Sequence, residues 1–232
     1  MTEQVLRTLV VDTARSFYGT EAGTVKHRSI LDTYNRHEPL ARGYKMTESD
    51  PWCATFVSTV AILCQLTDII PTECSCSRMI QLHKALGTWC EDDDLDPQPG
   101  DLLIYDWEDN GIGDCTGDPD HIGIVTAVTK GVIRVIEGNM AGKVWHRDIV
   151  VGGKCIRGYC CPDYAKAAEL MQAAGRTFAD VPRDAWYAEA VDYCARCELM
   201  VGTGDGKFEP DRAATRAELA AVVMRLHQKM TE

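Results

Sequence analysis

The stretch HIGIVTAVTKGVIRVIEGNM, residues 121–140, decides the fold of the first part of the chain. Its two halves, HIGIVTAV and VIRVIEGNM, are rich in β-branched residues, and the short segment TKG separates them. This pattern predicts a hairpin of two antiparallel strands. The start of one strand in a hairpin lies beside the end of the next. We therefore expect His121 to lie next to Glu137 or Asn139.

Further strands are predicted on both sides of this hairpin. DLLIYDW precedes it, and VWHRDIVV and CIRGYCC follow it. Nearer the N-terminus, apolar residues recur at helical spacing over residues 3–17, 25–36, 51–66 and 76–86. Helices followed by antiparallel strands predict an α+β fold for residues 1–163. Residues 164–177 predict an alanine-rich helical linker, and residues 178–232 predict a small all-helical module.

Composition excludes some classes of function. The formal net charge of −11 argues against a nucleic-acid partner, because phosphate binding needs clustered Lys and Arg. No stretch approaches the roughly 20 apolar residues that a membrane span needs. The N-terminal segment has helical spacing rather than the features of a signal peptide. We therefore expect synthesis in the cytoplasm, so that action outside it would need release by another component. Most of the 11 cysteines are expected to be reduced.

One cysteine has a distinctive setting, in DPWCATFV. Asp50 is a good N-cap and Pro51 suits the first helical position, which would place Cys53 near the third. There the free N–H groups and the helix dipole favour a thiolate, although the charge of Asp50 opposes it. His121 is the candidate base, and Glu137 or Asn139 would orient it. The alternative is a structural cysteine and an ordinary strand histidine.

The loop before His121 has the spacing of a cation site. In DWEDNGIGD, the residues Asp106, Glu108, Asn110 and Asp114 occupy positions 1, 3, 5 and 9 of an EF-hand-like loop. Position 12 is Gly117 instead of the expected glutamate. The loop predicts either a calcium site or an acidic solvated turn. The chemistry proposed for Cys53 itself requires no cofactor.

Residues from about 20 to 163 resemble a CHAP domain, the cysteine- and histidine-dependent amidohydrolase/peptidase family, of the type found in gut Firmicutes and their phages. The matching stretches are WCATFVSTVA, GDLLIYDW, DHIGIVTAV, VIEGN and IRGYCCPDY. The resemblance implies a papain-like fold and hydrolysis of amide bonds in peptidoglycan. It implies Cys53 as nucleophile, His121 as general base, Glu137 as its orienting partner and Asn139 as a nearby polar group.

The C-terminal part resembles one S-layer homology (SLH) repeat, through FADVPRDAWYAEAVDYC and GTGDGKFEPDRAATRAEL. The resemblance implies that Thr215, Arg216 and Glu218 belong to a signature that binds secondary cell-wall polysaccharide. Trp186 is either a core residue, which we favour, or an aromatic that stacks on the ligand. Such repeats usually occur in threes. A single one either binds weakly or associates with two further chains into a homotrimer.

These features together predict an endolysin-like peptidoglycan hydrolase that is anchored to wall polysaccharide. A bacterial autolysin and a wall-binding protein without catalytic activity are the alternatives. The sequence does not separate an amidase from an endopeptidase, because the same cysteine and histidine serve both.

Overall fold

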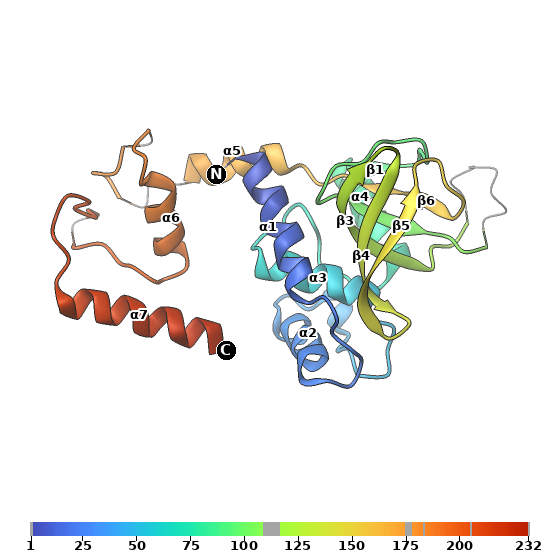
Figure 1. The fold of residues 1–232 in the computed structure, drawn as a ribbon, viewed down its shortest axis with the longest axis horizontal. Coiled ribbons are helices and arrows are strands. Elements are labelled where there is room, and N and C mark those ends of the chain that lie inside the picture. Colours follow the sequence, from blue (N-terminus) through green and yellow to red (C-terminus); the bar gives the residue numbers. More distant parts are fainter. Residues whose placement is uncertain (1, 109–116, 175–177, 183, 205, 232) are drawn as a thin grey trace. The chain divides into compact units, whose positions relative to one another are not determined.

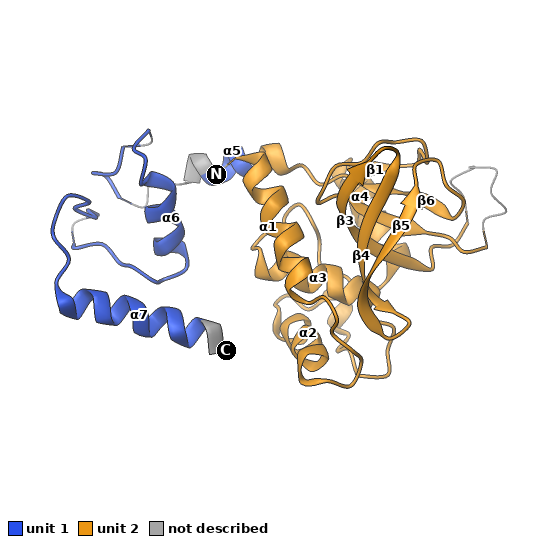
Figure 2. Ribbon diagram, in the orientation of Figure 1, with its two compact units in different colours: residues 1, 168–232 blue, residues 2–167 orange. Residues whose placement is uncertain are grey.

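The computed structural model describes residues 2–108, 117–174, 178–182, 184–204 and 206–231. Within these ranges the chain forms two compact units, Thr2–Ala167 and the residues from Ala168 onward, which Figure 2 distinguishes by colour. No helix in the described ranges combines the length and the hydropathy that crossing a bilayer would require.

Side-chain caps set the starts of several helices in the first unit. The side-chain oxygens of Thr2, Thr24 and Ser75 each accept a hydrogen bond from the backbone N–H three residues further on. The helices agree closely with the spacing of apolar residues in the sequence. They are α1 (Glu3–Ser16), α2 (Val25–Arg36), α3 (Cys53–Leu63) and α4 (Cys76–Leu86), with a short 3-10 turn η1 (Ala41–Gly43).

The strands form one antiparallel sheet in the order β1-β6-β2-β3-β4-β5. They are β1 (Trp89–Cys90), β2 (Leu102–Tyr105), β3 (His121–Thr129), β4 (Val132–Met140), β5 (Lys143–Val150) and β6 (Ile156–Cys160). The sequence did not predict β1, because two residues are too few to show an alternating pattern. Helices and an antiparallel sheet confirm the predicted α+β class (Figure 1).

The hairpin predicted from residues 121–140 is confirmed as β3 and β4, with Gly123 opposite Glu137. Between the strands, Lys130 and Gly131 have φ angles of 53° and 75°. Positive φ at both central positions is what a type I′ turn needs, and the twist of that turn matches the twist of the strands. Since side chains alternate along a strand, this register places His121 and Glu137 on one face of the hairpin.

Helix α3 packs against β3 and β4, and a glycine allows the close approach. A Cβ atom added to Gly138 would lie 2.4 Å from the Cβ of Phe56. The other face of the sheet has its own buried core, formed by Leu103, Tyr105, Val125, Ile133, Val135, Ile156 and Tyr159. The helix that begins at Cys53 is therefore fixed to the strands that carry His121 and Glu137.

Helix α5 (Tyr164–Ala174) crosses the border between the two units. The Tyr164 hydroxyl donates a hydrogen bond to the Gly100 carbonyl at 2.7 Å, and the Arg7 guanidinium lies 4.5 Å from the centre of the Tyr164 ring. These contacts attach the first turn of the predicted linker to the first unit. The domain borders at residues 163 and 177 stay predictions.

The second unit contains α6 (Ala188–Arg196) and α7 (Arg216–Thr231). Its small core consists of Phe178, Val181, Ala188 and Val191. The Asp180 carboxylate accepts hydrogen bonds from the backbone N–H groups of Phe208 and Glu209, both at 2.8 Å, and so holds the segment before α7. An isolated β bridge joins Gly204 and Lys207. The prediction of an all-helical module is therefore not confirmed.

The close packing of Gly138 against Phe56 limits the size of the side chain at position 138. Gly138→Ala should lower the free energy of unfolding by about 1–3 kcal/mol, because the added methyl group overlaps the Phe56 side chain. Urea unfolding of the full chain measures the change. Val132→Ala, at an exposed position of the same strand, is the control and should cost less than about 1 kcal/mol. Equal stabilities of Gly138→Ala and wild type would contradict the close packing.

Candidate active site

Cys53 is the first residue of α3, and the helix starts differently from the prediction. Trp52 occupies the N-cap position, with φ −116° and ψ 19° and no capping side chain. The expectation that Asp50 caps the helix, with Pro51 first and Cys53 near the third position, is wrong. Asp50 instead stabilises the preceding turn, where its carboxylate accepts hydrogen bonds at 2.7 Å from both the backbone N–H and the hydroxyl of Thr47.

The corrected start favours a thiolate at Cys53. The first N–H groups of a helix have no partner within the helix, and the positive end of the helix dipole lies among them. Cys53 stands at this end rather than three residues into the helix. The backbone N–H of Thr47 holds the pKa of Asp50 below its ordinary value, and Tyr44 donates a hydrogen bond to the same carboxylate. Hydrogen bonds within a surface turn thus stabilise the charge of Asp50.

His121 and Glu137 meet as the hairpin register predicts. His121 Nε2 lies 3.1 Å from Glu137 Oε2, and both side chains are buried. The ring nitrogen that meets the carboxylate is therefore Nε2 rather than Nδ1. Glu137 occupies Nε2 and leaves Nδ1 as the other ring nitrogen, and the Cys53 thiol lies near enough to His121 to raise the pKa of the imidazole. Glu137 rather than Asn139 therefore contacts the imidazole.

The thiol and the imidazole shift each other's pKa. A hydrogen bond with the Cys76 thiol lowers the pKa of Cys53 well below its ordinary value. Burial opposes this effect, and His121 strengthens it. Burial by itself lowers the pKa of His121, but contacts with Cys53 and Glu137 raise that pKa to about 9. A lowered cysteine pKa beside a raised histidine pKa favours a thiolate–imidazolium pair.

Arg147 on β5 completes the group, although the sequence argument did not identify it. Its Nε and Nη2 atoms donate to the two carboxylate oxygens of Glu137 at 2.8 Å and 3.2 Å. Burial raises the pKa of Glu137, but the contacts with His121 and Arg147 outweigh it and leave that pKa below its ordinary value. Glu137 is fully buried. A buried carboxylate is tolerated when it is paired in this way.

A cavity of about 240 Å³ opens beside His121. Its lining consists of Trp107, His121, Asn139, Met140, Ala141 and Arg147. The Arg147 guanidinium lies 4.8 Å from the centre of the Trp107 ring. Asn139, predicted as a nearby polar partner, is thus part of the cavity wall and does not hold the imidazole. The sequence argument did not identify Trp107 as part of the site. Trp107 ends the predicted strand DLLIYDW, but the alternation of apolar residues in that strand does not show which way the ring points.

Two of the four predicted calcium ligands can be placed. The buried Asp106 carboxylate accepts a hydrogen bond from the Glu108 backbone N–H at 2.9 Å. The Glu108 side chain itself is exposed. Asn110 and Asp114 lie outside the described residues. Calcium binding by this loop stays a prediction.

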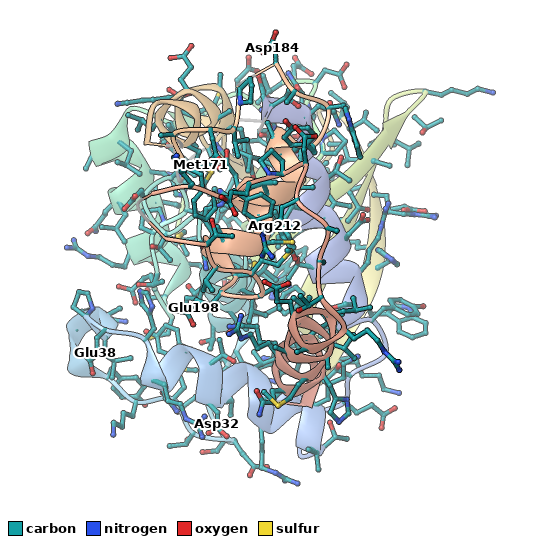
Figure 3. All side chains as sticks on the ribbon, turned by 90° about the vertical axis from the view of Figure 1, so that its left-hand side faces the viewer. Asp32, Glu38, Met171, Asp184, Glu198 and Arg212 are labelled. Atoms are coloured by element: carbon teal, nitrogen blue, oxygen red, sulfur yellow. The ribbon has the colours of Figure 1, made fainter. Side chains whose placement is uncertain are left out.

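In the second unit, Thr215 and Glu218 form a reciprocal capping box at the start of α7. Glu218 N–H donates to Thr215 Oγ1 at 3.2 Å, and Thr215 N–H and hydroxyl donate to Glu218 Oε2 at 2.7 Å and 2.9 Å. Arg212, labelled in Figure 3, pairs with the same carboxylate. Thr215 and Glu218, which were predicted to bind the wall, therefore stabilise the start of α7, whereas Arg216 is the exposed first residue of the helix.

Trp186 is not a core residue, so the interpretation that the sequence favoured is wrong. Its side chain is 92% exposed and meets the Tyr187 ring edge to face, with centroids 5.5 Å apart. The small core of the unit is made by other side chains, and Trp186 precedes α6 outside that core. An exposed ring is compatible with the alternative, which is stacking on a ligand.

Comparisons with known proteins agree with this division of the chain. A family model for the CHAP domain matches residues 44–139, and a model for the S-layer homology domain matches residues 177–220. The S-layer protein sap of Bacillus anthracis is 39% identical over 56 residues, and an S-layer protein of Bacillus thuringiensis subsp. finitimus is 37% identical over 56 residues.

Each of these two alignments covers 24% of this chain and 7% of the relative, and lies in the SLH region. No solved structure matches the chain significantly. The chain therefore carries a CHAP domain followed by an S-layer homology domain.

Proposed function

We propose that this chain is a peptidoglycan hydrolase that cleaves an amide bond of the Gram-positive cell wall, with Cys53 as its nucleophile. The observation that carries the proposal is the connected group of Cys53, His121 and Glu137, with the sulfur at a helix start. The CHAP match supports it, because that family comprises cysteine- and histidine-dependent amidohydrolases and peptidases.

The proposed reaction is acyl transfer to sulfur. The Cys53 thiolate attacks the amide carbonyl carbon and forms a carbon–sulfur bond. His121 Nδ1–H gives its proton to the amine as the carbon–nitrogen bond breaks. Water then attacks the thioester, its proton passes to His121, and the acid leaves. The Cys53 backbone N–H at the helix start is suited to stabilise the oxyanion.

Glu137 and Arg147 act in this scheme as positioning residues. Glu137 holds the ring through Nε2, which would leave Nδ1 for the sulfur, and its charge favours the imidazolium. Arg147 fixes both oxygens of Glu137. The cavity lined by Trp107 and Asn139 would receive part of the substrate beside His121.

The second unit would keep the enzyme on its polymeric substrate. An SLH domain implies binding to cell-wall polysaccharide. Arg216 at the start of α7 is suited to an acidic sugar, since arginine pairs well with carboxylate groups. Trp186 would offer an exposed ring to the glycan. Association into a homotrimer would raise the effective affinity for the wall.

We further propose a phage or prophage endolysin that a holin releases, with a bacterial autolysin as the alternative. A wall-binding protein without hydrolytic activity is the alternative from another class.

Mass spectrometry of released fragments identifies the bond that is cleaved. New N-termini on stem or bridge peptides indicate an endopeptidase, and free lactyl groups on muramic acid indicate an amidase.

Cys53→Ala should reduce the lysis of Gram-positive walls to the background rate, because no other group in the proposed mechanism forms the acyl intermediate. Turbidity of a wall suspension measures the rate. Cys64→Ala is the matched control, since Cys64 is buried at the opposite end of α3 and should leave the rate nearly unchanged. Equal lysis by Cys53→Ala and wild type would overturn the assignment of the nucleophile.

The pH dependence tests the histidine. Hydrolysis should decline as the pH rises through about 9, where His121 loses the proton that the leaving amine needs. Glu137→Gln removes the charge that helps to raise this pKa, so the decline should begin at lower pH. Asp148→Asn, at an exposed carboxylate on β5, should leave the profile in place. An unshifted decline in Glu137→Gln would contradict the role of Glu137.

Arg216→Gln should lower retention on isolated walls several-fold, because it removes the exposed cation proposed to pair with an acidic sugar. Cosedimentation with walls, in the Cys53→Ala background to prevent lysis, measures the retention. Arg225→Gln is the control on the same helix, since Arg225 donates instead to the Leu199 carbonyl. Unchanged retention in Arg216→Gln would remove this residue from the binding site.

A further inference from the structure

A second sulfur lies beside the nucleophile and forms no covalent bond in the proposed mechanism. Cys76 is the first residue of α4, and its sulfur lies 3.7 Å from the sulfur of Cys53. Both residues are buried, with exposed fractions of 8% and 5%. The starts of two helices thus bring two thiols into contact, although 22 residues separate them in sequence.

Hydrogen bonds attach the segment before α4 to α3. Ser58 on α3 donates to the Glu73 carbonyl at 2.7 Å and accepts from the Glu73 backbone N–H at 2.8 Å. The Glu73 carboxylate is held in turn by Arg42 Nη2 at 2.6 Å. The segment that leads into α4 is therefore attached directly to α3, and the two sulfurs are held near each other.

The two thiols are not equivalent. The contact with Cys53 raises the pKa of Cys76 well above its ordinary value, whereas the pKa of Cys53 is lowered. The two sulfurs therefore titrate as a coupled pair. We expect Cys53 to react first with an electrophile, and Cys76 is the neighbouring thiol that can react second.

We propose that Cys53 and Cys76 form a redox pair, in which hydrogen peroxide oxidises Cys53 and Cys76 then closes a reversible disulfide. The disulfide would switch off the hydrolase proposed above and protect its nucleophile from irreversible oxidation. In its effect on activity the inference rests on the proposed function. The formation of the disulfide itself does not depend on it.

The chemistry balances with peroxide as the only oxidant. The Cys53 thiolate attacks one peroxide oxygen, the O–O bond breaks, and sulfenic acid and hydroxide form. The Cys76 sulfur then attacks the sulfenic sulfur. Its proton leaves with the hydroxyl group as water, and an S–S bond forms. Two electrons pass from the two sulfurs to peroxide, and a dithiol such as dithiothreitol returns them.

The geometry permits this closure. A disulfide places its sulfurs about 2.05 Å apart. From the present 3.7 Å the two must approach by about 1.7 Å, a distance within reach of small rotations of the two side chains. Cys64, the C-cap residue of α3, sits at the opposite end of that helix, hydrogen-bonded to Thr13, and burial raises its pKa to about 11.

Disulfide mapping of the full chain tests the pair. The protein is treated with hydrogen peroxide, alkylated without reduction, and digested with trypsin and a glutamate-specific protease. Cleavage after Glu48, Glu73 and Arg78 separates residues 49–73 from residues 74–78 unless a disulfide joins them. Fragmentation of the joined peptides then identifies which cysteines are linked.

We expect the link to join Cys53 to Cys76 and to revert with dithiothreitol. Lysis of walls should fall with peroxide and recover after reduction. In Cys76→Ala, the recovered fraction should be about tenfold smaller, because Cys53 proceeds to sulfinic acid. Cys76→Ser is a second variant with the same expectation, and Cys64→Ala should recover as wild type does.

Two results would overturn the redox pair. One is wild-type Cys53 oxidised to sulfinic acid while Cys76 remains a free thiol. The other is equal recovery of wild type and both Cys76 variants. A mapped disulfide between Cys53 and Cys76 supports the pair even in a protein that never lyses walls. Failure of the proposed function is seen separately, as a lack of lysis before peroxide is added.

Discussion

The buried carboxylate of Glu137 is the group on which the site depends. It has no exposure to solvent, and it is shared between His121 and Arg147. An unpaired charge at this depth would cost several kcal/mol. The three side chains come from β3, β4 and β5, so the pairing of these strands and the electrostatics of the site stabilise each other. A change at any one of them alters the state of the other two.

Much of this arrangement could be predicted from the sequence, because it depends on local patterns. The alternation in residues 121–140 gave the hairpin, and the hairpin placed His121 beside the end of β4. The choice between Glu137 and Asn139 could not be made in the same way. The pairing of β4 with β5 shifts between Glu137 and Met140, and Asn139 has a φ of 58° there. An irregularity of this kind has no reliable pattern in one sequence.

The wrong and missing predictions arise either from competing local hydrogen bonds or from tertiary structure that a local sequence pattern does not show. Asp50 is of a residue type that often caps helices, but its carboxylate instead accepts a hydrogen bond from the Thr47 backbone N–H in the preceding turn. Aspartate side chains often bond to nearby backbone groups in this way. Arg147 and Cys76 reach the site from an adjacent strand and a separate helix. Trp186 was expected inside because it is large and apolar, although a unit of this size has room for few such side chains.

The tight turn at Lys130 and Gly131 has a consequence for how such a chain can diverge. Because a one-residue slip in a strand pair reverses which side chains face each side, the length of this turn determines whether Glu137 or its neighbours Ile136 and Gly138 stand opposite Gly123. A single insertion or deletion there would leave every residue of the site in the sequence and yet turn the carboxylate away from the imidazole. The number of residues in this exposed turn therefore affects the arrangement of the candidate site as much as the identity of its side chains does.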